Sequence, residues 1–165
     1  MNADELDSLT ERVRGLRCDP WCGNTTRFAH PFLGHYTSDI SEHVRARVAR
    51  RAEHRCEYCL IHEDDAGFSH QVDHIVSRKH GGTSAFDNLA YACILCNRYK
   101  GSDVAAINPK TAEAVRLFHP RHDRWVDHFR FAADFVEPLS DVGSATVRLL
   151  RLNPAERLAE RRLLA

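Results

Sequence analysis

The stretch VDHIVSRKHGGTSAFDNLAYACILCNRYK, residues 72–100, decides the fold of this chain together with an earlier CEYC at residues 56–59. Its last part contains one Cys-x-x-Cys pair, Cys93 and Cys96, and the earlier segment contains another, Cys56 and Cys59. Such spacing lets two thiolates from one tight turn bind the same ion, and two such turns complete the tetrahedral shell of Zn²⁺. We therefore predict a structural zinc site made by these cysteines.

Two other interpretations of the cysteines remain open at this stage, namely two unrelated pairs of buried thiols and a redox motif. A thioredoxin-like motif needs a β-α-β context, which the pattern lacks. A zinc-dependent base deaminase needs His-x-Glu upstream and Pro before the second pair, whereas Ala92 precedes Cys93 here. Because four thiolates fill the zinc shell, any catalytic water must be activated by other residues.

Composition limits the chain to one domain with appendages. It has 165 residues, of which 43% are hydrophobic and 28% charged, which is typical of a globular protein. Since 23 Lys and Arg balance 23 Asp and Glu, any attraction to nucleic acid must come from local patches, and the 11 His add positive charge only at mildly acidic pH. We find neither a signal-peptide pattern nor an apolar run long enough for a membrane span, and therefore expect a cytoplasmic protein with reduced thiols and no membrane partner.

The local pattern predicts a strand, a loop, a second strand and a short helix between residues 68 and 100. Residues 68–76 are rich in β-branched and aromatic types, and a loop with Gly81-Gly82 follows them. A second strand is expected at 89–92. From Cys93 to Lys100 we expect a tight turn that carries the second cysteine pair (a zinc knuckle) and then a short helix, which Gly101 ends. Upstream, Asp39 as N-cap with Glu42 three residues later predicts a helix to about His54, and a short amphipathic helix is expected at 5–16.

The C-terminal part predicts a strand followed by two helices. Alternating Phe129 and Phe131 indicate the strand, and we expect both of them, with Trp125, in the core. The first helix begins near Ser140. The second has Asn153 as N-cap and Pro154 as its first residue.

Residues 41–103 strongly resemble the HNH endonuclease family, in the subgroup whose ββα-metal motif is clamped by four cysteines. The resemblance rests on four segments in the order typical of the family: 72–76 (VDHIV), 81–82 (GG), 87–89 (DNL) and 96–100 (CNRYK). It implies an α+β fold in which a small ββα-metal core with zinc knuckles is flanked by helices. We accordingly predict an N-terminal extension at 1–37, the HNH domain at 38–104, and a C-terminal strand-and-helix extension at 105–165 that packs on the core and resembles a tail found in many bacterial HNH proteins.

The resemblance implies a role for each residue of the site. His74 matches the general base, Asp73 a metal-binding carboxylate, and Asn88 the residue that braces the loop orienting the base. Asn97 falls where the third letter of the family name stands, and it would be the second protein ligand of the catalytic ion. Because carboxylate and amide oxygens suit hard cations, Mg²⁺ or Mn²⁺ is expected. Adjacent strand residues point to opposite faces, so Asp73 and His74 can share a site only where the strand ends or twists.

The predicted function is hydrolysis of DNA phosphodiester bonds to 5′-phosphate and 3′-hydroxyl ends. Phosphate contacts are expected from basic residues around the site: Arg78, Lys79, His80, Arg98 and Lys100. For His70 a structural role is favoured over one beside the phosphate. Two alternatives remain: a non-catalytic zinc module that binds nucleic acid or a protein, and a nuclease with the same site that cuts RNA.

Overall fold

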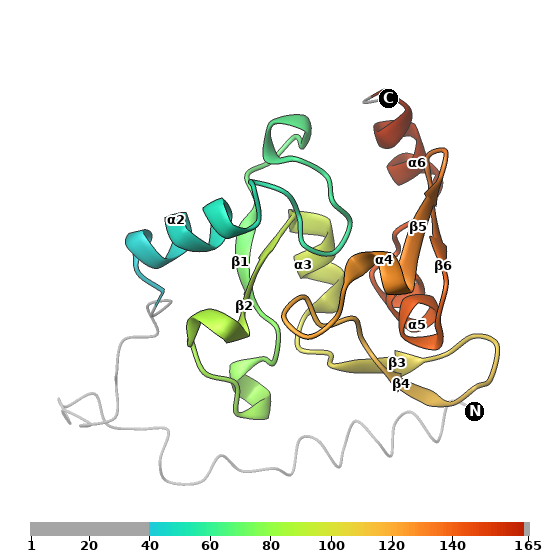
Figure 1. Cartoon of the computed structure of the whole chain (residues 1–165), viewed down its shortest axis with the longest axis horizontal. Helices are drawn as coiled ribbons and strands as arrows, with labels where there is room; N and C mark the ends of the chain where they lie inside the picture. Colours follow the sequence, from blue (N-terminus) through green and yellow to red (C-terminus); the bar gives the residue numbers. More distant parts are fainter. Residues whose placement is uncertain (1–39, 164–165) are drawn as a thin grey trace, which may run out of the picture. The chain divides into compact units, whose positions relative to one another are not determined.

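A computed structural model of the chain describes residues 40–163. The helix predicted at 5–16 lies outside the described residues, and so do the two remaining cysteines of the chain, Cys18 and Cys22. The elements are α2 (Glu42–Arg51), β1 (Gln71–His74), β2 (Leu89–Ala92), α3 (Ile94–Lys100), β3 (Ala105–Ile107), β4 (Ala114–Arg116), α4 (Trp125–His128), β5 (Phe129–Ala132), β6 (Phe135–Pro138), α5 (Asp141–Leu149) and α6 (Ala155–Arg162) (Figure 1). Helices and small antiparallel strand pairs together confirm the predicted α+β class.

The β1–β2 hairpin lies between α2 and α3 (Figure 1). Its strands are antiparallel, and Asp73 pairs with Ala90 while His74 pairs with Leu89. Leu89 and Tyr91 pack with residues of α2, whereas Ala90 and Ala92 pack with the four cysteines. Because side chains alternate along a strand, each face of β2 meets a different part of the core, and all four of its residues are buried.

The C-terminal segment shares a hydrophobic core with the cysteine region. Strands β3 and β4 form one hairpin, β5 and β6 form another, and α5 packs against both of them. The core cluster that contains the four cysteines also contains residues from this segment: Phe118, Phe129, Val136, Leu150 and Leu152. Within residues 40–163, no helix is both long and apolar enough to cross a membrane.

The ends of α2 differ from the prediction. Ser41 is the N-cap, because its hydroxyl accepts a hydrogen bond from the Val44 N–H at 3.3 Å, so the assignment of that cap to Asp39 was wrong. The helix ends at Arg51 instead of His54, since Glu53 and His54 have positive φ angles of 50° and 56°. A left-handed backbone cannot continue an α-helix.

The elements nearest the predicted site were correct or nearly so. Strand β2 and the end of α3 lie where expected, and Gly101, with φ of 51°, caps α3. Strand β1 is shorter than the predicted strand at 68–76, because only residues Gln71–His74 pair with β2.

Two predictions for the C-terminal segment were wrong. Pro154, not Asn153, precedes the first helical residue of α6, and the Asn153 side chain instead accepts from the Val136 N–H at 2.9 Å and donates to the Val136 carbonyl at 2.8 Å. Phe129 is 1% exposed as a core residue should be, but Phe131 is 45% exposed and stacks on the half-buried ring of Trp125.

Candidate metal and catalytic sites

The four cysteines of the two Cys-x-x-Cys pairs lie together in the core. The sulfur atoms of Cys56, Cys59, Cys93 and Cys96 all lie within 4.8 Å of one another, and none forms a disulfide. Cys59 and Cys93 have their sulfurs 3.8 Å apart. Four sulfurs at about 2.3 Å from a tetrahedral zinc would be separated by about 3.8 Å, so this arrangement suits a zinc ion.

Residues of the C-terminal segment hold both cysteine pairs. The indole N–H of Trp125 donates to the Tyr58 carbonyl at 3.0 Å, and Arg121 forms an ion pair with Glu57, so the turn between Cys56 and Cys59 is fixed from outside. The guanidinium of Arg157 reaches the sulfurs of the second pair. Sequence reasoning missed these contacts, because nothing in the local pattern tells which distant polar residue faces a knuckle.

Asp73 points to the α3 side of β1 and is buried. Its Oδ2 atom accepts a hydrogen bond from the Tyr58 hydroxyl at 3.1 Å and forms an ion pair with the Lys100 ammonium at 3.0 Å. Asp73 and Lys100 are only 7% and 2% exposed. Burial raises the pKa of the Asp73 carboxyl, while Lys100 opposes that rise. Lys100 and Tyr58 are therefore the partners of the Asp73 carboxylate, and the Tyr58 contact connects it to the first cysteine pair.

His74 is the last residue of β1, so the strand ends at the site as the sequence argument required. The Nε2 atom of its half-buried ring shares a hydrogen bond with the Ser84 hydroxyl at 3.0 Å. Its carbonyl oxygen accepts from the Lys100 ammonium at 2.9 Å. Burial lowers the pKa of His74, with Asp73 acting in the opposite direction. The lowered pKa favours the neutral imidazole, which is the form that can accept a proton.

Asn88 holds the two ends of the loop that follows β1. Its Oδ1 atom accepts from the Val76 N–H at 2.9 Å, and its Nδ2 group donates to the carbonyls of Val76 at 2.9 Å and Thr83 at 2.7 Å. Gly82 lies against this contact, and a Cβ atom there would clash with the Val76 carbonyl. The loop carries Ser84, the hydrogen-bond partner of His74.

Asn97 lies on α3 and faces β1, but its contact is with Gln71. Its Nδ2 group donates to the Gln71 side chain, which is two residues from Asp73 on the same face of the strand. Lys100, one turn further along α3, is the residue that contacts Asp73. Asp73 and Asn97 thus both lie at the interface between β1 and α3, where Asp73 contacts Lys100 and Asn97 contacts Gln71.

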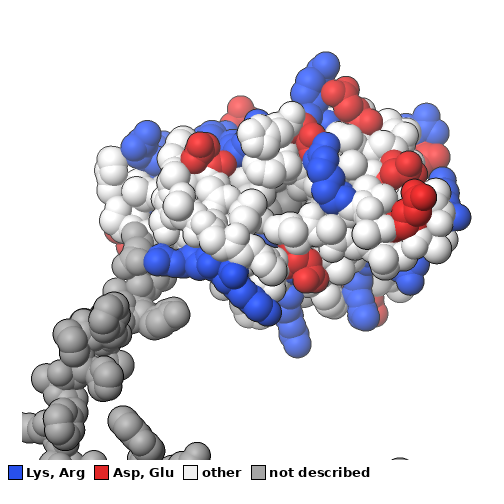
Figure 2. Space-filling model, turned by 90° about the horizontal axis from the view of Figure 1, so that it is seen from below, with Lys and Arg blue, Asp and Glu red and all other residues white. Residues whose placement is uncertain are grey.

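The basic residues predicted to contact nucleic acid fall into two groups. Arg78, Lys79 and His80 form an exposed 3₁₀ turn in the loop that follows β1, and Arg98 is exposed on α3. Lys100 is buried and ion-paired, so its placement argues against a phosphate contact. On the face seen in Figure 2, basic and acidic side chains are interspersed, in keeping with the balanced charge of the chain.

His70 has the structural role that the sequence favoured. It is 7% exposed, its Nε2 atom lies 3.0 Å from the Ile61 carbonyl, and its ring packs beside Tyr91 at a centroid distance of 5.2 Å. These contacts tie the segment before β1 to the core.

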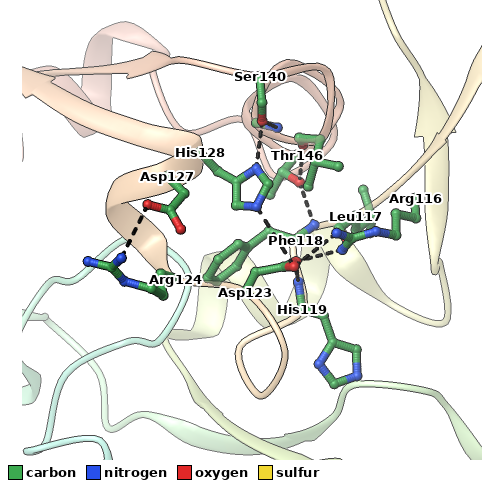
Figure 3. Close-up of polar contacts among 12 residues, drawn as sticks. Arg116, Leu117, Phe118, His119, Asp123, Arg124, Asp127, His128, Ser140 and Thr146 are labelled. Carbon is green, nitrogen blue, oxygen red and sulfur yellow. Dashed lines mark hydrogen bonds and ion pairs between the residues drawn. The ribbon is translucent and has the colours of Figure 1, made fainter.

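A second polar network lies in the C-terminal segment and resembles a Ser-His-Asp array only in its residue types (Figure 3). The Ser140 hydroxyl lies 2.6 Å from His128 Nδ1, and His128 Nε2 lies 3.8 Å from Asp123. Ser140 also caps α5, and Arg116 binds both oxygens of Asp123 and, with the His119 N–H, holds the pKa of that carboxyl at about 2. The network therefore fixes the chain around α5 and offers no activated nucleophile.

Comparison with known families agrees with the geometry. Residues 56–103 match the family described as HNH endonuclease, in agreement with the resemblance found in the sequence. Its four clustered cysteines fit the zinc-binding subgroup. No curated protein and no solved structure matched the chain. The family connects the chain with nuclease or other nucleic-acid-related functions.

Proposed function

We propose that this protein is a metal-dependent endonuclease that hydrolyses phosphodiester bonds in DNA, with His74 as general base and a structural zinc ion on the four cysteines. The observation that carries the proposal is the setting of His74 inside the family-matching segment. Ser84 holds Nε2, and Nδ1 makes no hydrogen bond with any described residue. If Nε2 carries the proton and donates to Ser84, the lone pair of Nδ1 is available to accept a proton from water.

The chain's own residues supply the proton transfer. Phosphodiester hydrolysis needs a deprotonated water in line with the leaving oxygen, and a neutral imidazole can remove that proton in the transition state. Ser84 would fix the tautomer and the direction of the ring, and Asn88 would keep the Ser84 loop in place. Lys100, by binding the His74 carbonyl, would hold the backbone from which the base projects.

Asp73 and Asn97 are the residues that would hold the catalytic cation. Their donor chemistry fits Mg²⁺ or Mn²⁺. The contacts of Asp73 with Lys100 and Tyr58 are both made by Oδ2, so the cation would bind through the other carboxylate oxygen. The cation would absorb the negative charge that builds up on the phosphate. With few protein ligands, magnesium takes its remaining oxygens from water and the substrate phosphate.

The exposed cations beside the site would bind the nucleic-acid backbone. Arg78, Lys79 and His80 follow the strand that carries the base, and Arg98 follows Asn97 directly. Such phosphate contacts supply affinity and carry no sequence information. Because the overall charge is balanced, we expect modest affinity with a strong dependence on salt.

A non-catalytic zinc module is the competing function. A pure binder would have no need of a base next to a carboxylate, and the loop contacts of Asn88 and Ser84 would then serve no chemical purpose. RNA is the alternative substrate for the same site, and comparing DNA with RNA under the same conditions distinguishes the two nucleases.

The test is incubation of supercoiled plasmid with purified protein in metal-free buffer, with and without added Mg²⁺ or Mn²⁺. We expect nicking or linearisation that depends on the added cation and falls about 10²- to 10⁴-fold in His74→Ala, because a general base contributes that much. The exposed histidine of α2 gives a matched control, and His43→Ala should cleave like the parent protein. Cleavage that persists undiminished in His74→Ala would point to a contaminant and favour the binding module.

A further inference from the structure

Arg157 is a buried arginine of α6 that contacts the second cysteine pair. Its Nη1 group donates to the Cys93 sulfur at 3.7 Å, and its Nη2 group donates to the Cys96 sulfur at 3.8 Å. The residue is 3% exposed, which is unusual for an arginine on a surface helix. Both terminal nitrogens of the guanidinium are therefore directed at one knuckle.

The surroundings of Arg157 offer little other compensation for its charge. Glu160 forms an ion pair with Nε at 3.7 Å, too long for a hydrogen bond, and Nε has no hydrogen-bond partner among the described residues. A buried cation is costly unless it has an anionic, hydrogen-bonding partner. Neutral thiols would not provide that partner, whereas thiolates bound to a metal ion would.

We propose that Arg157 is an outer-sphere partner of the metal-bound thiolates of Cys93 and Cys96, which makes α6 part of the metal site. The proposal rests on the zinc-binding role given above to the four cysteines. Zinc with four thiolates carries two net negative charges, and the guanidinium offsets one of them. Hydrogen bonds to the atoms that bind a metal orient those atoms and tune the affinity, so their loss weakens metal binding.

The proposal predicts an asymmetry between the two pairs. Among the described residues, the hydrogen bonds of Arg157 to sulfur go to the second pair. The first pair is held through its backbone by Trp125 and through Glu57 by Arg121. Loss of the guanidinium should therefore expose the thiolates of Cys93 and Cys96 to electrophiles more than those of the first pair.

The experiment measures zinc retention in the full chain. The Arg157→Met variant removes the charge and the hydrogen bonds, and Arg157→Lys keeps the charge but loses the two-pronged geometry. Arg162→Met on the same helix is the matched control, because Arg162 is an exposed cation that pairs with Asp134. Zinc content, transfer of zinc to a competing chelator, and alkylation of each cysteine in the zinc-loaded protein are measured for all variants.

We expect zinc affinity to fall about 10- to 100-fold in Arg157→Met, with a smaller loss in Arg157→Lys and none in Arg162→Met. Alkylation should rise first at Cys93 and Cys96. The proposal is overturned if zinc-loaded Arg157→Met keeps its affinity within about twofold of the parent, or if all four cysteines become equally reactive. If Arg157→Met does not fold, the Arg157→Lys variant decides by the same criteria. A parent protein that purifies without bound metal would instead overturn the zinc site itself.

Discussion

The cysteine cluster and the His74 site are built in opposite ways, although α3 contributes to both. In the cluster, four residues of one kind lie in the core and are at most 5% exposed. Around His74, residues of different kinds are each held by a separate partner: Ser84 for the imidazole, Lys100 and Tyr58 for Asp73, and Gln71 for Asn97. The first arrangement suits an ion that stays, and the second suits a cation that shares its ligands with water and substrate.

The two regions are nevertheless joined by direct contacts. Tyr58 lies between the two cysteines of the first pair, and its hydroxyl donates a hydrogen bond to the Asp73 carboxylate. At the other pair, Cys96 is followed immediately by Asn97. Loss of the cluster should therefore disturb the candidate catalytic residues, whereas changes at His74 should leave the cluster intact.

The largest effect is expected from removing one sulfur. Cys96→Ser should abolish the folded state and with it all cleavage, because a structural zinc contributes about 10–16 kcal/mol, as much as the whole stability of a typical domain. Near-UV circular dichroism and zinc content measure the loss. Ile94→Ser is a suitable control, since it places a hydroxyl at an exposed position of the same helix. A folded, active Cys96→Ser protein would show that the two regions are independent.

Removing the buried ammonium should have the next largest effect. Lys100→Met leaves the Asp73 carboxylate without its cation, and breaking a buried ion pair costs about 3–5 kcal/mol. Urea unfolding measures the change, and Lys79→Met at an exposed position should shift stability by less than about 0.5 kcal/mol. In the double variant with Asp73→Asn much of the loss should return. A Lys100→Met protein as stable as its parent would refute the importance of this pair.

A smaller effect is expected at the loop. Asn88→Ala removes the hydrogen bonds to Val76 and Thr83 and should cost about 1–3 kcal/mol. Cleavage should fall because Ser84 loses its position, while bound zinc is retained. Asp87→Ala, at the exposed neighbouring position, should change neither property. Zinc loss in Asn88→Ala would mean that the loop supports the cluster and not only the base.

The smallest effect concerns pH. Burial lowers the pKa of His74 below 6.5, so its neutral, active form persists to more acidic pH than a free imidazole would allow, and activity is lost only as the pH falls through that lowered value. Arg78 contributes to the lowering, so Arg78→Met should move the midpoint to higher pH. Titration of the His74 ring by NMR, assigned by its absence in His74→Ala, measures both. A midpoint above 6.5 in the parent would contradict this account.

Sequence was a good guide wherever local spacing determines structure. The cysteine pairs, β2, the Gly101 cap of α3 and the start of α5 near Ser140 follow from residues within a few positions of each other, and the structure agrees with them. The family resemblance added the roles expected of the residues at the site. The specific roles of His74, Asp73, Asn88 and Asn97 remain proposals, now with defined contacts.

What could not be predicted depends on distant partners. Asn153 fits an N-cap by sequence, but its side chain forms hydrogen bonds with the backbone of Val136 instead of capping α6. Lys100 was predicted as a surface cation because of its basic neighbours, yet it is buried and forms an ion pair with Asp73. Arg157 carries no local sign that it faces two sulfurs from 61 and 64 positions away. Polar residues with several possible partners are settled by the tertiary fold alone.

Helix α3 also fixes distances between the two regions. It has seven residues, with Cys96 near its beginning and Lys100, the clamp on the end of β1, at its last position. One residue inserted between them would turn the ammonium by about 100° around the helix axis and away from the strand. Chain length between Cys96 and Lys100 is therefore constrained as strictly as the identity of these two residues, and insertions should be tolerated only beyond Gly101.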